Sequence, residues 1–477
     1  MPNFAHQEET YLATRDLQNY AIFWEQGTGK TKLALDTAAY LHAQGKIDAV
    51  LVLAPNGVQR NWIEDELPKW LPSANGAFHT TQRMGTKGGR AAIVAACDGP
   101  FPVLAMSYDG IMTKAGAELA ARVLKTRRTL FICDESTAIK NAGAKRTKRV
   151  LAAGKYAAYR RIMNGTPIPN SPFDLYSQIR FLDDDFWKRL GYANSAVFKE
   201  YFGKWETGKL KEPMVTKSGK VITEFRFVSH FRNLQQLHDH IDPISHRVLK
   251  ADVLDLPDKL YTKRYFDLSP EQRKVYKEIK DEALTFLATG EMLTAPLAIV
   301  RMLRLQQVTC NYLPTETGDY LDLAPNNPRL RCLETLLEEV THGCIIWARF
   351  RRDIDLICEM LGDKCVRYDG AVKDDARAQA KQRFQSGGAQ FFVGNPAAAG
   401  MGLTLTAART VVYYNNDFRL ATRLQSEDRA HRIGQEHPVE YVDIMAPNTI
   451  DGHIVRALRN KVNIASVVTG DNLKEWI

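Results

Sequence analysis

Short apolar runs alternate along the chain with segments whose apolar residues have helical spacing. This alternation is typical of parallel β-sheets whose strands are joined by crossover helices. The runs fall into two groups, which are residues 21–24, 49–54, 103–106 and 129–133, and then residues 344–348, 391–393, 410–415 and 439–445. We therefore predict an α/β fold with two lobes, formed by residues 1–182 and 321–477.

The segment between these lobes, residues 183–320, is rich in charged residues and helix formers and contains few strand-like runs. We predict that it forms a mostly helical insert and linker. Glycine and lysine are frequent over residues 208–220, which indicates an exposed hairpin or loop. A chain of 477 residues is also too long for one ordinary core, so two or three domains are expected.

Composition and charge indicate a globular protein with a polyanionic partner. Apolar residues make up 45% of the chain and charged residues 25%. Lys and Arg exceed Asp and Glu by 64 to 55, and the resulting net charge of +9 favours nucleic acid as the partner. The seven cysteines include no C-x-x-C pair, which indicates reduced thiols rather than a zinc site.

The sequence gives no sign of secretion or of membrane insertion. The first ten residues are polar and include two acids, unlike a signal peptide. No apolar run approaches the roughly 20 residues that are needed to cross a bilayer. We therefore expect a cytoplasmic protein without membrane association.

A glycine-rich turn, Gly27-Thr28-Gly29-Lys30-Thr31, lies between the first predicted strand and a helix predicted over residues 31–44. A phosphate-binding loop requires this context, because glycines let backbone N–H groups surround phosphate oxygens and the helix N-terminus adds its positive end. We predict that Lys30 reaches the β- and γ-phosphates and that the Thr31 hydroxyl binds Mg²⁺. Trp24 stands where the full G-x-x-x-x-G-K-T pattern has its first glycine.

Two carboxylates, Asp134 and Glu135, directly follow the apolar run of residues 129–133. An acid at the end of a strand can hold the Mg²⁺ ion, and the next acid can act as general base on the attacking water. We assign Asp134 to the metal and Glu135 to the water.

Four segments carry a resemblance to a known family. They are D-E-S-T-A-I-K-N at 134–141, N-G-T-P-I-P-N at 164–170, A-G-M-G-L-T-L-T at 399–406 and Q-S-E-D-R-A-H-R-I-G-Q at 425–435. They resemble motifs II, III, V and VI of the Swi/Snf-type ATPases, a branch of the helicase-like proteins of superfamily two. Further matches run in the family's order, at His6-Gln7, Ala54-Pro55-Asn56, Asn61-Trp62, Met106-Ser107-Tyr108 and Tyr368-Asp369-Gly370.

The resemblance implies two RecA-like lobes with ATP in the cleft between them. Lobe one would supply the phosphate loop and the two acids, and lobe two would supply Gln425, Arg429 and Arg432. An arginine that faces the γ-phosphate contributes about 10³–10⁵ in rate, and either arginine can take this role. The implied cofactors are ATP and Mg²⁺.

The resemblance also implies which residues bind the nucleotide. His6 and Gln7 match the element that contacts adenine, and Gly402 belongs to the segment that is similar to motif V. With the loop itself, the predicted nucleotide-binding residues are His6, Gln7, Gly27, Thr28, Gly29, Lys30, Thr31 and Gly402.

The chain departs from the family pattern at several positions. Ser136-Thr137 replace the usual Ala-His, Asn164 replaces a threonine, Thr404 replaces the asparagine of motif V, and Phe418-Arg419-Leu420 replace W-N-P. The departures near the acids predict a different coupling between the ATP site and motif III. The chain is short and shows no bromodomain-like, chromodomain-like or SANT-like segment. It therefore resembles the compact motors of bacteria and bacteriophages.

Nucleic-acid contacts are predicted from the resemblance and from charge. By their position in motifs Ia, Ib, IV and V, the candidates are Gln59, Asn61, Ser107, Tyr108, Arg349 and Asn395. Seven basic residues between motifs II and III, among them Lys145 and Arg146, form a run without an acid. This run either contacts phosphates or is an exposed helix face. No helix-turn-helix or zinc-finger pattern suggests base readout, so we expect little sequence preference.

Three functions compete on this basis. The first is a DNA-dependent ATPase that translocates on double-stranded DNA without separating the strands, which the resemblance favours. The second is an ATP-dependent helicase that separates strands of DNA or RNA. The third is a non-enzymatic DNA-binding module with an inactive ATP site, which the presence of Lys30, Asp134, Glu135, Arg429 and Arg432 disfavours.

Overall fold

The computed structural model describes residues 4–215, 221–287, 296–372, 374–397 and 403–471, which fold into two compact units. Unit 1 contains Met1–Lys199, Asn233–Asp255 and Ile464–Asn472. Unit 2 contains Glu200–Arg232, Leu256–Asn463 and Leu473–Ile477. Each unit is built around one parallel β-sheet that helices cover, which confirms the predicted α/β class and fits two RecA-like lobes.

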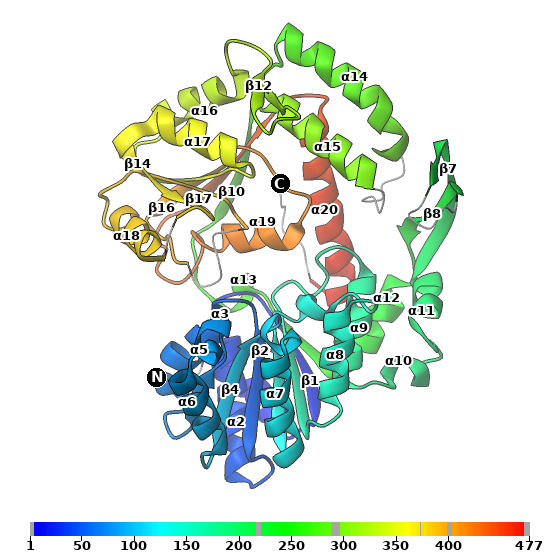
Figure 1. The fold of residues 1–477 in the computed structure, drawn as a ribbon, viewed down its shortest axis with the longest axis vertical. Helices are drawn as coiled ribbons and strands as arrows, with labels where there is room; N and C mark the ends of the chain where they lie inside the picture. Colours follow the sequence, from blue (N-terminus) through cyan, green and yellow to red (C-terminus); the bar gives the residue numbers. More distant parts are fainter. Residues whose placement is uncertain (1–3, 216–220, 288–295, 373, 398–402, 472–477) are drawn as a thin grey trace. The chain divides into compact units, whose positions relative to one another are not determined.

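The sheet of unit 1 has seven parallel strands in the order β3-β4-β2-β5-β6-β1-β9. Their bounds are β1 Asn19–Trp24, β2 Ala49–Ala54, β3 Asn75–Phe78, β4 Pro102–Ser107, β5 Thr129–Asp134, β6 Tyr159–Met163 and β9 Ser245–Val248. Helices lie on both faces of the sheet (Figure 1), and the central strands β2, β4 and β5 are therefore buried along their whole length. Full burial explains why these strands read as continuous apolar runs.

The helices of unit 1 follow the strands in alternation. They are α1 Ala5–Thr14, α2 Lys30–Ala43, α3 Val58–Asn61, α4 Leu67–Trp70, α5 Thr81–Gly85, α6 Lys87–Asp98, α7 Lys114–Thr126, α8 Lys145–Gly154, α9 Leu175–Leu182, α10 Phe186–Arg189, α12 Leu234–Ile241 and α13 Lys250–Val253. Leu33 and Leu41 of α2 pack in one core cluster with Ile132 of β5. On the opposite face of β5, the ring of Phe131 meets Phe181 of α9 edge-on, with ring centroids 5.0 Å apart.

The sheet of unit 2 has six parallel strands in the order β10-β17-β16-β13-β15-β14. Their bounds are β10 Lys259–Tyr265, β13 Gly343–Trp347, β14 Cys365–Tyr368, β15 Phe391–Gly394, β16 Ala408–Tyr413 and β17 Val439–Met445. Successive residues of β13 point to opposite faces, so Ile346 joins one core cluster and Ile345 joins the other.

The helices of unit 2 are α14 Pro270–Leu287, α15 Pro296–Thr309, α16 Pro328–Glu338, α17 Arg351–Leu361, α18 Asp374–Gln385, α19 Leu420–Glu427 and the first part of α20 Ile450–Thr469. A small antiparallel pair, β11 Tyr312–Pro314 and β12 Tyr320–Asp322, follows α15. Within the described ranges, no helix is both long and apolar enough to cross a membrane.

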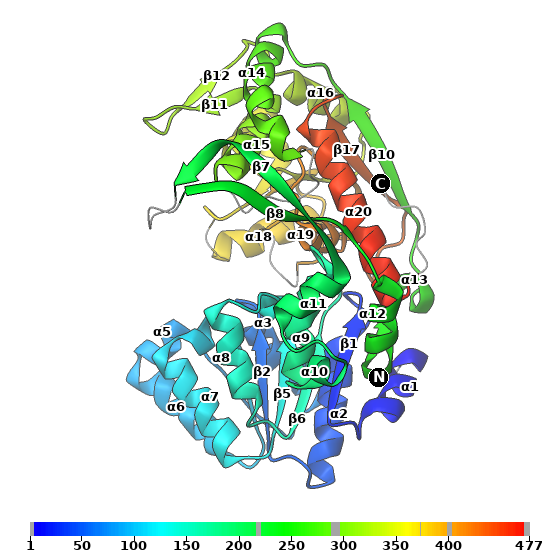
Figure 2. The same cartoon turned by 90° about the vertical axis from the view of Figure 1, so that its right-hand side faces the viewer.

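The segment predicted as a mostly helical insert, residues 183–320, is divided between the two units instead. It contributes β9 to the edge of the first sheet and β10 to the edge of the second. It also contains α11 Ser195–Phe202 and a long antiparallel hairpin, β7 Gly203–Val215 and β8 Val221–Phe231 (Figure 2). The two edge strands were not predicted from the sequence because they are largely polar and partly exposed, and therefore lack an apolar run.

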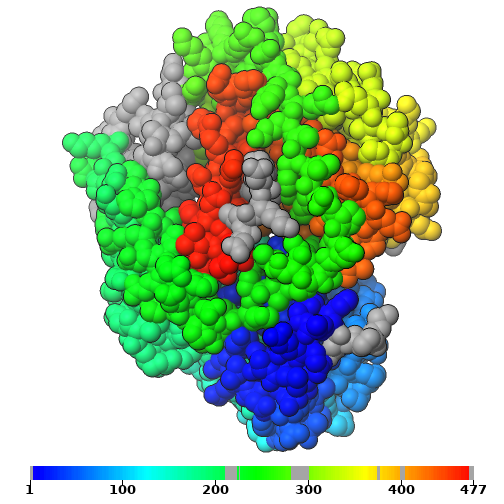
Figure 3. Space-filling view, turned by 180° about the vertical axis from the view of Figure 1, so that it is seen from behind, coloured from blue at the N-terminus to red at the C-terminus, as the bar shows by residue number. Residues whose placement is uncertain are grey.

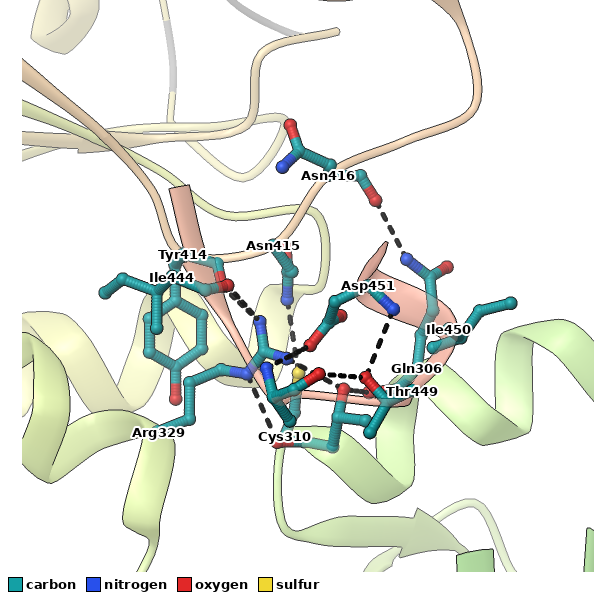
Figure 4. Close-up of polar contacts among 12 residues, drawn as sticks. Gln306, Cys310, Arg329, Tyr414, Asn415, Asn416, Ile444, Thr449, Ile450 and Asp451 are labelled. Carbon is teal, nitrogen blue, oxygen red and sulfur yellow. Dashed lines mark hydrogen bonds and ion pairs between the residues drawn. The ribbon is translucent and has the colours of Figure 1, made fainter. Parts of the chain in front are cut away.

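A fully buried arginine connects the elements of unit 2. Arg329, at the start of α16, forms an ion pair with Asp451 in the first turn of α20. The same guanidinium donates to the Thr309 hydroxyl at 2.9 Å and to the carbonyl oxygens of Ile444, at 3.3 Å, and Tyr414. It therefore joins α15, α16, α20 and the ends of β16 and β17 (Figure 4).

We predict that Asp451→Asn lowers the free energy of unfolding of unit 2 by about 3–5 kcal/mol, because it leaves the Arg329 charge buried without a carboxylate. The measurement is a urea titration of the full chain. Glu339→Gln is the control, since its ion pair with Arg264 is exposed and such pairs contribute about 0–1 kcal/mol. Equal effects of the two substitutions would contradict a central role for Arg329.

Candidate active site and nucleic-acid interface

The loop between β1 and α2 has the form that its glycines predict. Gly27 and Gly29 adopt left-handed backbone angles, with φ of +84° and +93°, and α2 begins at Lys30. A Cβ atom on Gly29 would lie 1.9 Å from Nε2 of Gln7. Glycine at this position therefore allows both the turn of the loop and the close approach of α1.

Lys30 points back into this loop. Its Nζ donates to the carbonyl oxygens of Trp24, at 2.8 Å, and Glu25, at 3.0 Å, and its side chain is buried. The Thr28 hydroxyl donates to the same Glu25 carbonyl at 2.8 Å. Thr31 lies in the first turn of α2 and is partly exposed. A buried ammonium group beside a helix N-terminus is suited to bind phosphate oxygens.

Helix α1 carries the two residues predicted to contact adenine, and both lie against the phosphate loop. His6 Nε2 is 2.9 Å from the carbonyl oxygen of Thr28, and Gln7 Nε2 donates to the same oxygen at 3.1 Å. The ring of His6 also meets Trp24 edge-on, with centroids 5.0 Å apart. Trp24 thus supports α1 at the position where the longer phosphate-loop pattern has glycine.

Asp134 stands at the end of β5 and is held from two sides. Trp62 Nε1 donates to its Oδ2 at 3.0 Å, and the Tyr108 hydroxyl donates to its backbone carbonyl at 2.8 Å. Burial raises the pKa of Asp134, while the Trp62 hydrogen bond and the charge of Lys30 oppose the rise. β5 pairs with β6 and β6 pairs with β1, so this carboxylate lies at the same edge of the sheet as the phosphate loop.

Glu135 lies beside the same loop. It adopts left-handed backbone angles, with φ of +53°, which is uncommon for a residue other than glycine. Its Oε1 accepts a hydrogen bond from Nε2 of Gln26, a residue of the phosphate loop, at 3.2 Å. Such strained residues persist where surrounding contacts hold them, and they are frequent at active sites. The structure therefore brings Lys30, Asp134 and Glu135 together in unit 1.

Thr137 and Asn164, two of the departures from the family pattern near the acids, contact each other. Asn164 Nδ2 donates to the Thr137 hydroxyl at 3.3 Å, and Asn164 Oδ1 accepts from the Thr166 N–H at 2.7 Å. The Ser136 hydroxyl donates to Gln178 Oε1 at 2.6 Å. The replacement side chains therefore connect the acid loop to the loop that follows β6.

Two basic residues of this site were not predicted from the sequence. Arg247, on β9, donates through Nη1 to the carbonyl oxygens of Phe23, at 2.7 Å, and Gly165, at 2.9 Å. Lys250, at the start of α13, is buried, and its N–H donates to Glu25 Oε2 at 2.8 Å. Both lie in the charged segment predicted as an insert, and no motif marks them there. The pairing of β9 with β1 is what brings them to the site.

Unit 2 carries the predicted arginines just after α19. Nη1 of Arg429 and Nη1 of Arg432 both donate to the carbonyl oxygen of Leu403, at 3.5 and 3.4 Å. Arg429 is buried, and burial lowers the pKa of Arg432. Gln425 lies on α19 and is partly exposed. Gly402 lies outside the described residues, but its neighbour Leu403 places the arginines beside the segment that is similar to motif V.

A buried charge network fixes α19. Arg423 pairs with Asp443 of β17 at 2.6 Å and with Glu427 at 2.9 Å. Glu427 also accepts hydrogen bonds from Lys259, at 3.1 Å, and from the Tyr261 hydroxyl, at 2.8 Å, both on β10. These partners compensate the cost of burying charge, and the network holds α19 against β17 and β10 just before the arginine-bearing segment.

The predicted nucleic-acid contacts of unit 1 differ in exposure. Asn61 is exposed, whereas Gln59, Ser107 and Tyr108 are buried. Ser107 Oγ accepts from the Gly110 N–H at 2.9 Å, and the Tyr108 hydroxyl supports Asp134. The side chains of Ser107 and Tyr108 therefore shape the loop after β4 and do not offer a surface to a ligand.

The seven basic residues between motifs II and III do not share one exposed face. Three donate to backbone carbonyl oxygens, namely Arg149, Arg160 and Arg161. Two form ion pairs, namely Arg146 with Asp109 and Lys155 with Asp184. The remaining two, Lys145 and Lys148, are exposed on α8, as is Arg149. The expectation of a continuous basic face therefore reduces to Lys145 and Lys148, because the four arginines and Lys155 make contacts within the protein.

Arg349 and Asn395 lie together at the carboxyl ends of β13 and β15. Asn395 Nδ2 donates to the Arg349 carbonyl oxygen at 2.7 Å, and the Arg349 N–H donates to Asn415 Oδ1 at 2.7 Å. The Arg349 guanidinium contacts Gln306 of α15, and burial lowers its pKa. The structure therefore joins both predicted residues to the loop after β16, whose Asn415 appears in Figure 4.

The first parallel sheet carries a glycine loop that leads into a helix and two acids at the end of a strand. The second carries two arginines between β16 and β17. These features are typical of a phosphate-loop protein of the helicase-like class. Two family descriptions match the chain, "SNF2-related domain" over residues 10–312 and "Helicase conserved C-terminal domain" over residues 328–434. The chain belongs to the SNF2-related family, which confirms the resemblance seen in the motifs. The likeness to compact bacterial and bacteriophage motors stays a prediction.

Curated relatives match most of this chain. It is 27% identical to "Chromodomain-helicase-DNA-binding protein 1-like" of Danio rerio, over 96% of this chain and 42% of that protein. It is 26% identical to "SWI/SNF-related matrix-associated actin-dependent regulator of chromatin subfamily A member 1" of Homo sapiens, over 93% of this chain and 41% of that protein. The chain thus spans less than half the length of these relatives.

One solved structure is similar over most of both chains. It is the "Sulfolobus solfataricus SWI2/SNF2 ATPase core in complex with dsDNA", with 21% sequence identity and a TM-score of 0.42. The similarity covers 98% of this chain and 93% of that one.

We predict that Gly29→Ala weakens ATP binding at least about tenfold, because the new Cβ combines backbone strain with a clash against Gln7. The measurement is a titration with a fluorescent ATP analogue. Gly45→Ala is the matched control, since Gly45 also has a positive φ, +64°, but open space around it. Equal affinities of the two variants would show that the approach of α1 to the loop has no part in nucleotide binding.

Proposed function

We propose that this chain hydrolyses ATP and uses the energy to move along double-stranded DNA without separating the strands. The observation that carries the proposal is the meeting of Lys30, Asp134 and Glu135 at one glycine loop. Membership in the SNF2-related family supports the same reading. An inactive binding module would not need a general base held in a strained backbone beside a phosphate loop.

The nucleotide chemistry assigns a role to each residue of the loop region. The N–H groups of residues 27–31 and the Lys30 ammonium would bind phosphate oxygens. Hydroxyl and carboxylate oxygens are the protein ligands that Mg²⁺ prefers, so Thr31 and Asp134 would hold the ion. When bound, Mg²⁺ neutralises charge on the phosphates. Glu135 would orient and deprotonate the attacking water, since the Gln26 contact holds it at the loop.

Arg429 and Arg432 would supply the positive charge that stabilises the transition state, and Gln425 would act with them. Both guanidinium groups donate to the same carbonyl oxygen, so a small rearrangement at Leu403 would affect both. Because these arginines and Lys30 belong to different units, hydrolysis would depend on the two units together. Such dependence converts a chemical step into movement.

Double-stranded DNA is the partner that we infer. The net charge of +9 favours a polyanion, and the names of the relatives include DNA binding and chromatin regulation. Asn61, Lys145 and Lys148 of unit 1 would face the backbone. Arg349 and Asn395 would contribute from unit 2. Contacts to phosphates carry no base information, so the motor would show little sequence preference.

A strand-separating helicase is the alternative, and one observation favours it. The hairpin β7–β8 has strands of 13 and 11 residues, longer than the other strands described here. A projecting hairpin can serve as a wedge that stacks on a fork. The residues between the two strands, 216–220, lie outside the described residues.

We predict that Lys30→Ala abolishes ATP binding, because it removes the cation of the phosphate loop. Glu135→Gln and Arg432→Ala should bind ATP with an affinity within roughly tenfold of normal, since both residues act on the transition state. Glu135→Gln should stall hydrolysis, and Arg432→Ala should reduce turnover by a factor of about 10³. Steady-state ATPase assays with duplex DNA and nucleotide titrations test this. Normal turnover in Glu135→Gln would rule out Glu135 as the base.

We predict that reversing Lys145 and Lys148 to glutamate weakens DNA binding and lowers the log–log salt slope by about one for each lost contact. Lys274 and Lys277 provide the matched control, because they are also exposed, three residues apart on a helix, and change the net charge equally. The binding constant is measured against salt concentration. Equal slopes for the two double variants would assign Lys145 and Lys148 to a solvated face.

We predict that duplex DNA stimulates ATP hydrolysis at least as well as single strands, because a motor that grips phosphates can follow one strand while its partner stays paired. The same chain should displace a third strand from a triplex and leave a forked duplex intact. Both substrates are tested in parallel with ATP. Efficient unwinding of the fork, with stimulation by single strands alone, would favour the helicase.

A further inference from the structure

Arg247 connects two loops of the candidate ATP site. It lies on β9 opposite Phe23 of β1, and its Nη1 donates to the Phe23 carbonyl at 2.7 Å and to the Gly165 carbonyl at 2.9 Å. Phe23 lies just before the phosphate loop, and Gly165 lies in the loop after β6. One guanidinium group therefore sets the spacing between these two segments.

The other side of the same guanidinium is held by Asp471. Arg247 Nε lies 2.9 and 3.2 Å from the two carboxylate oxygens of Asp471, and Nη2 lies 3.0 Å from Oδ2. Both side chains are largely buried, at 18% and 13% exposed. A two-pronged, charge-assisted contact of this kind fixes the plane of the guanidinium, and so directs Nη1 at the two carbonyl oxygens.

The end of α20 positions Asp471. The helix ends at Thr469, Gly470 turns the chain with φ of +75°, and the Asp471 N–H donates back to the Ser466 carbonyl at 3.0 Å. His238 Nδ1 of α12 lies 3.0 Å from the Val468 carbonyl oxygen. The space-filling view shows the red end of α20 against green residues of the same unit (Figure 3).

Loss of the Asp471 carboxylate would affect the phosphate loop directly. A second carboxylate near Arg247 is that of Glu25, whose Oε1 lies 3.9 Å from Nη2. Glu25 belongs to the phosphate loop, and its carbonyl accepts from both Lys30 and Thr28. If Arg247 turned toward Glu25, its hydrogen bonds to the Phe23 and Gly165 carbonyl oxygens would break. The new contact with Glu25 would displace the segment that holds Lys30.

We propose that Asp471 is a positioning residue for ATP binding, which acts through Arg247 on the phosphate loop and on the loop after β6. The proposal rests on the proposed ATP hydrolysis. It gives the chain's last described helix a role in nucleotide affinity. That helix begins among residues of unit 2, so its end provides a covalent route from unit 2 to the nucleotide loops.

The test compares ATP turnover of the full chain and of Asp471→Asn with saturating duplex DNA. We expect KM for ATP, and the Kd of a fluorescent ATP analogue, to rise about tenfold, which is the effect of losing one charge-assisted contact, while kcat changes little. Asp471→Glu, which restores the carboxylate, should recover most of the affinity. Asp239→Asn is the control, because this exposed aspartate of α12 contacts Gln235 and no residue of the loops.

A purely structural role for Asp471 would give a different result. It would lower the melting temperature without moving KM or Kd, and that outcome would overturn the proposal. If Asp471→Asn does not fold, Arg247→Lys decides, since lysine keeps the charge but cannot contact Asp471, Phe23 and Gly165 in the same geometry. A raised Kd supports the proposal, and an unchanged Kd overturns it.

Failure of the proposed function would be recognised separately. If the unchanged chain shows no ATP turnover with any nucleic acid, the proposed hydrolysis is wrong. Analogue binding then still tests Asp471. A weaker Kd in Asp471→Asn supports its positioning role, and equal Kd values overturn it.

Discussion

Parallel pairing brings the carboxyl ends of neighbouring strands to the same edge of a sheet, and the candidate site depends on this geometry. β6 pairs with both β1 and β5, so the phosphate loop, the acid loop and the loop of Asn164 begin side by side. β9 extends the same edge and adds Arg247. Residues far apart in the sequence, such as Lys30 and Asp134, therefore come to the same edge of the sheet.

Buried and largely buried arginines fix the geometry within each unit. Arg329 joins α15, α16 and α20, Arg423 anchors α19 to β17, and Arg247 connects β1 to the loop after β6. Each guanidinium satisfies several acceptors in fixed directions, which apolar packing alone does not specify. Buried ion pairs add little net stability, so we interpret these three as devices that fix geometry.

The number of basic residues in a segment does not show how many of them face a ligand. The run between motifs II and III reads as a surface for phosphates, yet Arg160 and Arg161 donate to backbone carbonyl oxygens and Arg146 pairs with Asp109. An arginine offers five donors, so it often completes the hydrogen bonding of a loop end. Arg149 and Lys155 are as exposed as Lys145 and Lys148, but Arg149 donates to backbone carbonyl oxygens and Lys155 pairs with Asp184, and the sequence does not contain these contacts.

The sequence by itself determined the local features: the glycine loop before α2, the acids after β5, the two groups of buried parallel strands and the family. These are readable because a buried strand must be apolar and a phosphate loop must contain glycine at positive φ. The tertiary structure alone decided the rest. The polar strands β9 and β10 lie at the edges of the two sheets, whereas the sequence predicted a helical insert there. Tyr108 is buried and its hydroxyl contacts the backbone of Asp134. Arg247 forms an ion pair with Asp471. Such contacts depend on the pairing of distant segments, which leaves no local pattern in the chain.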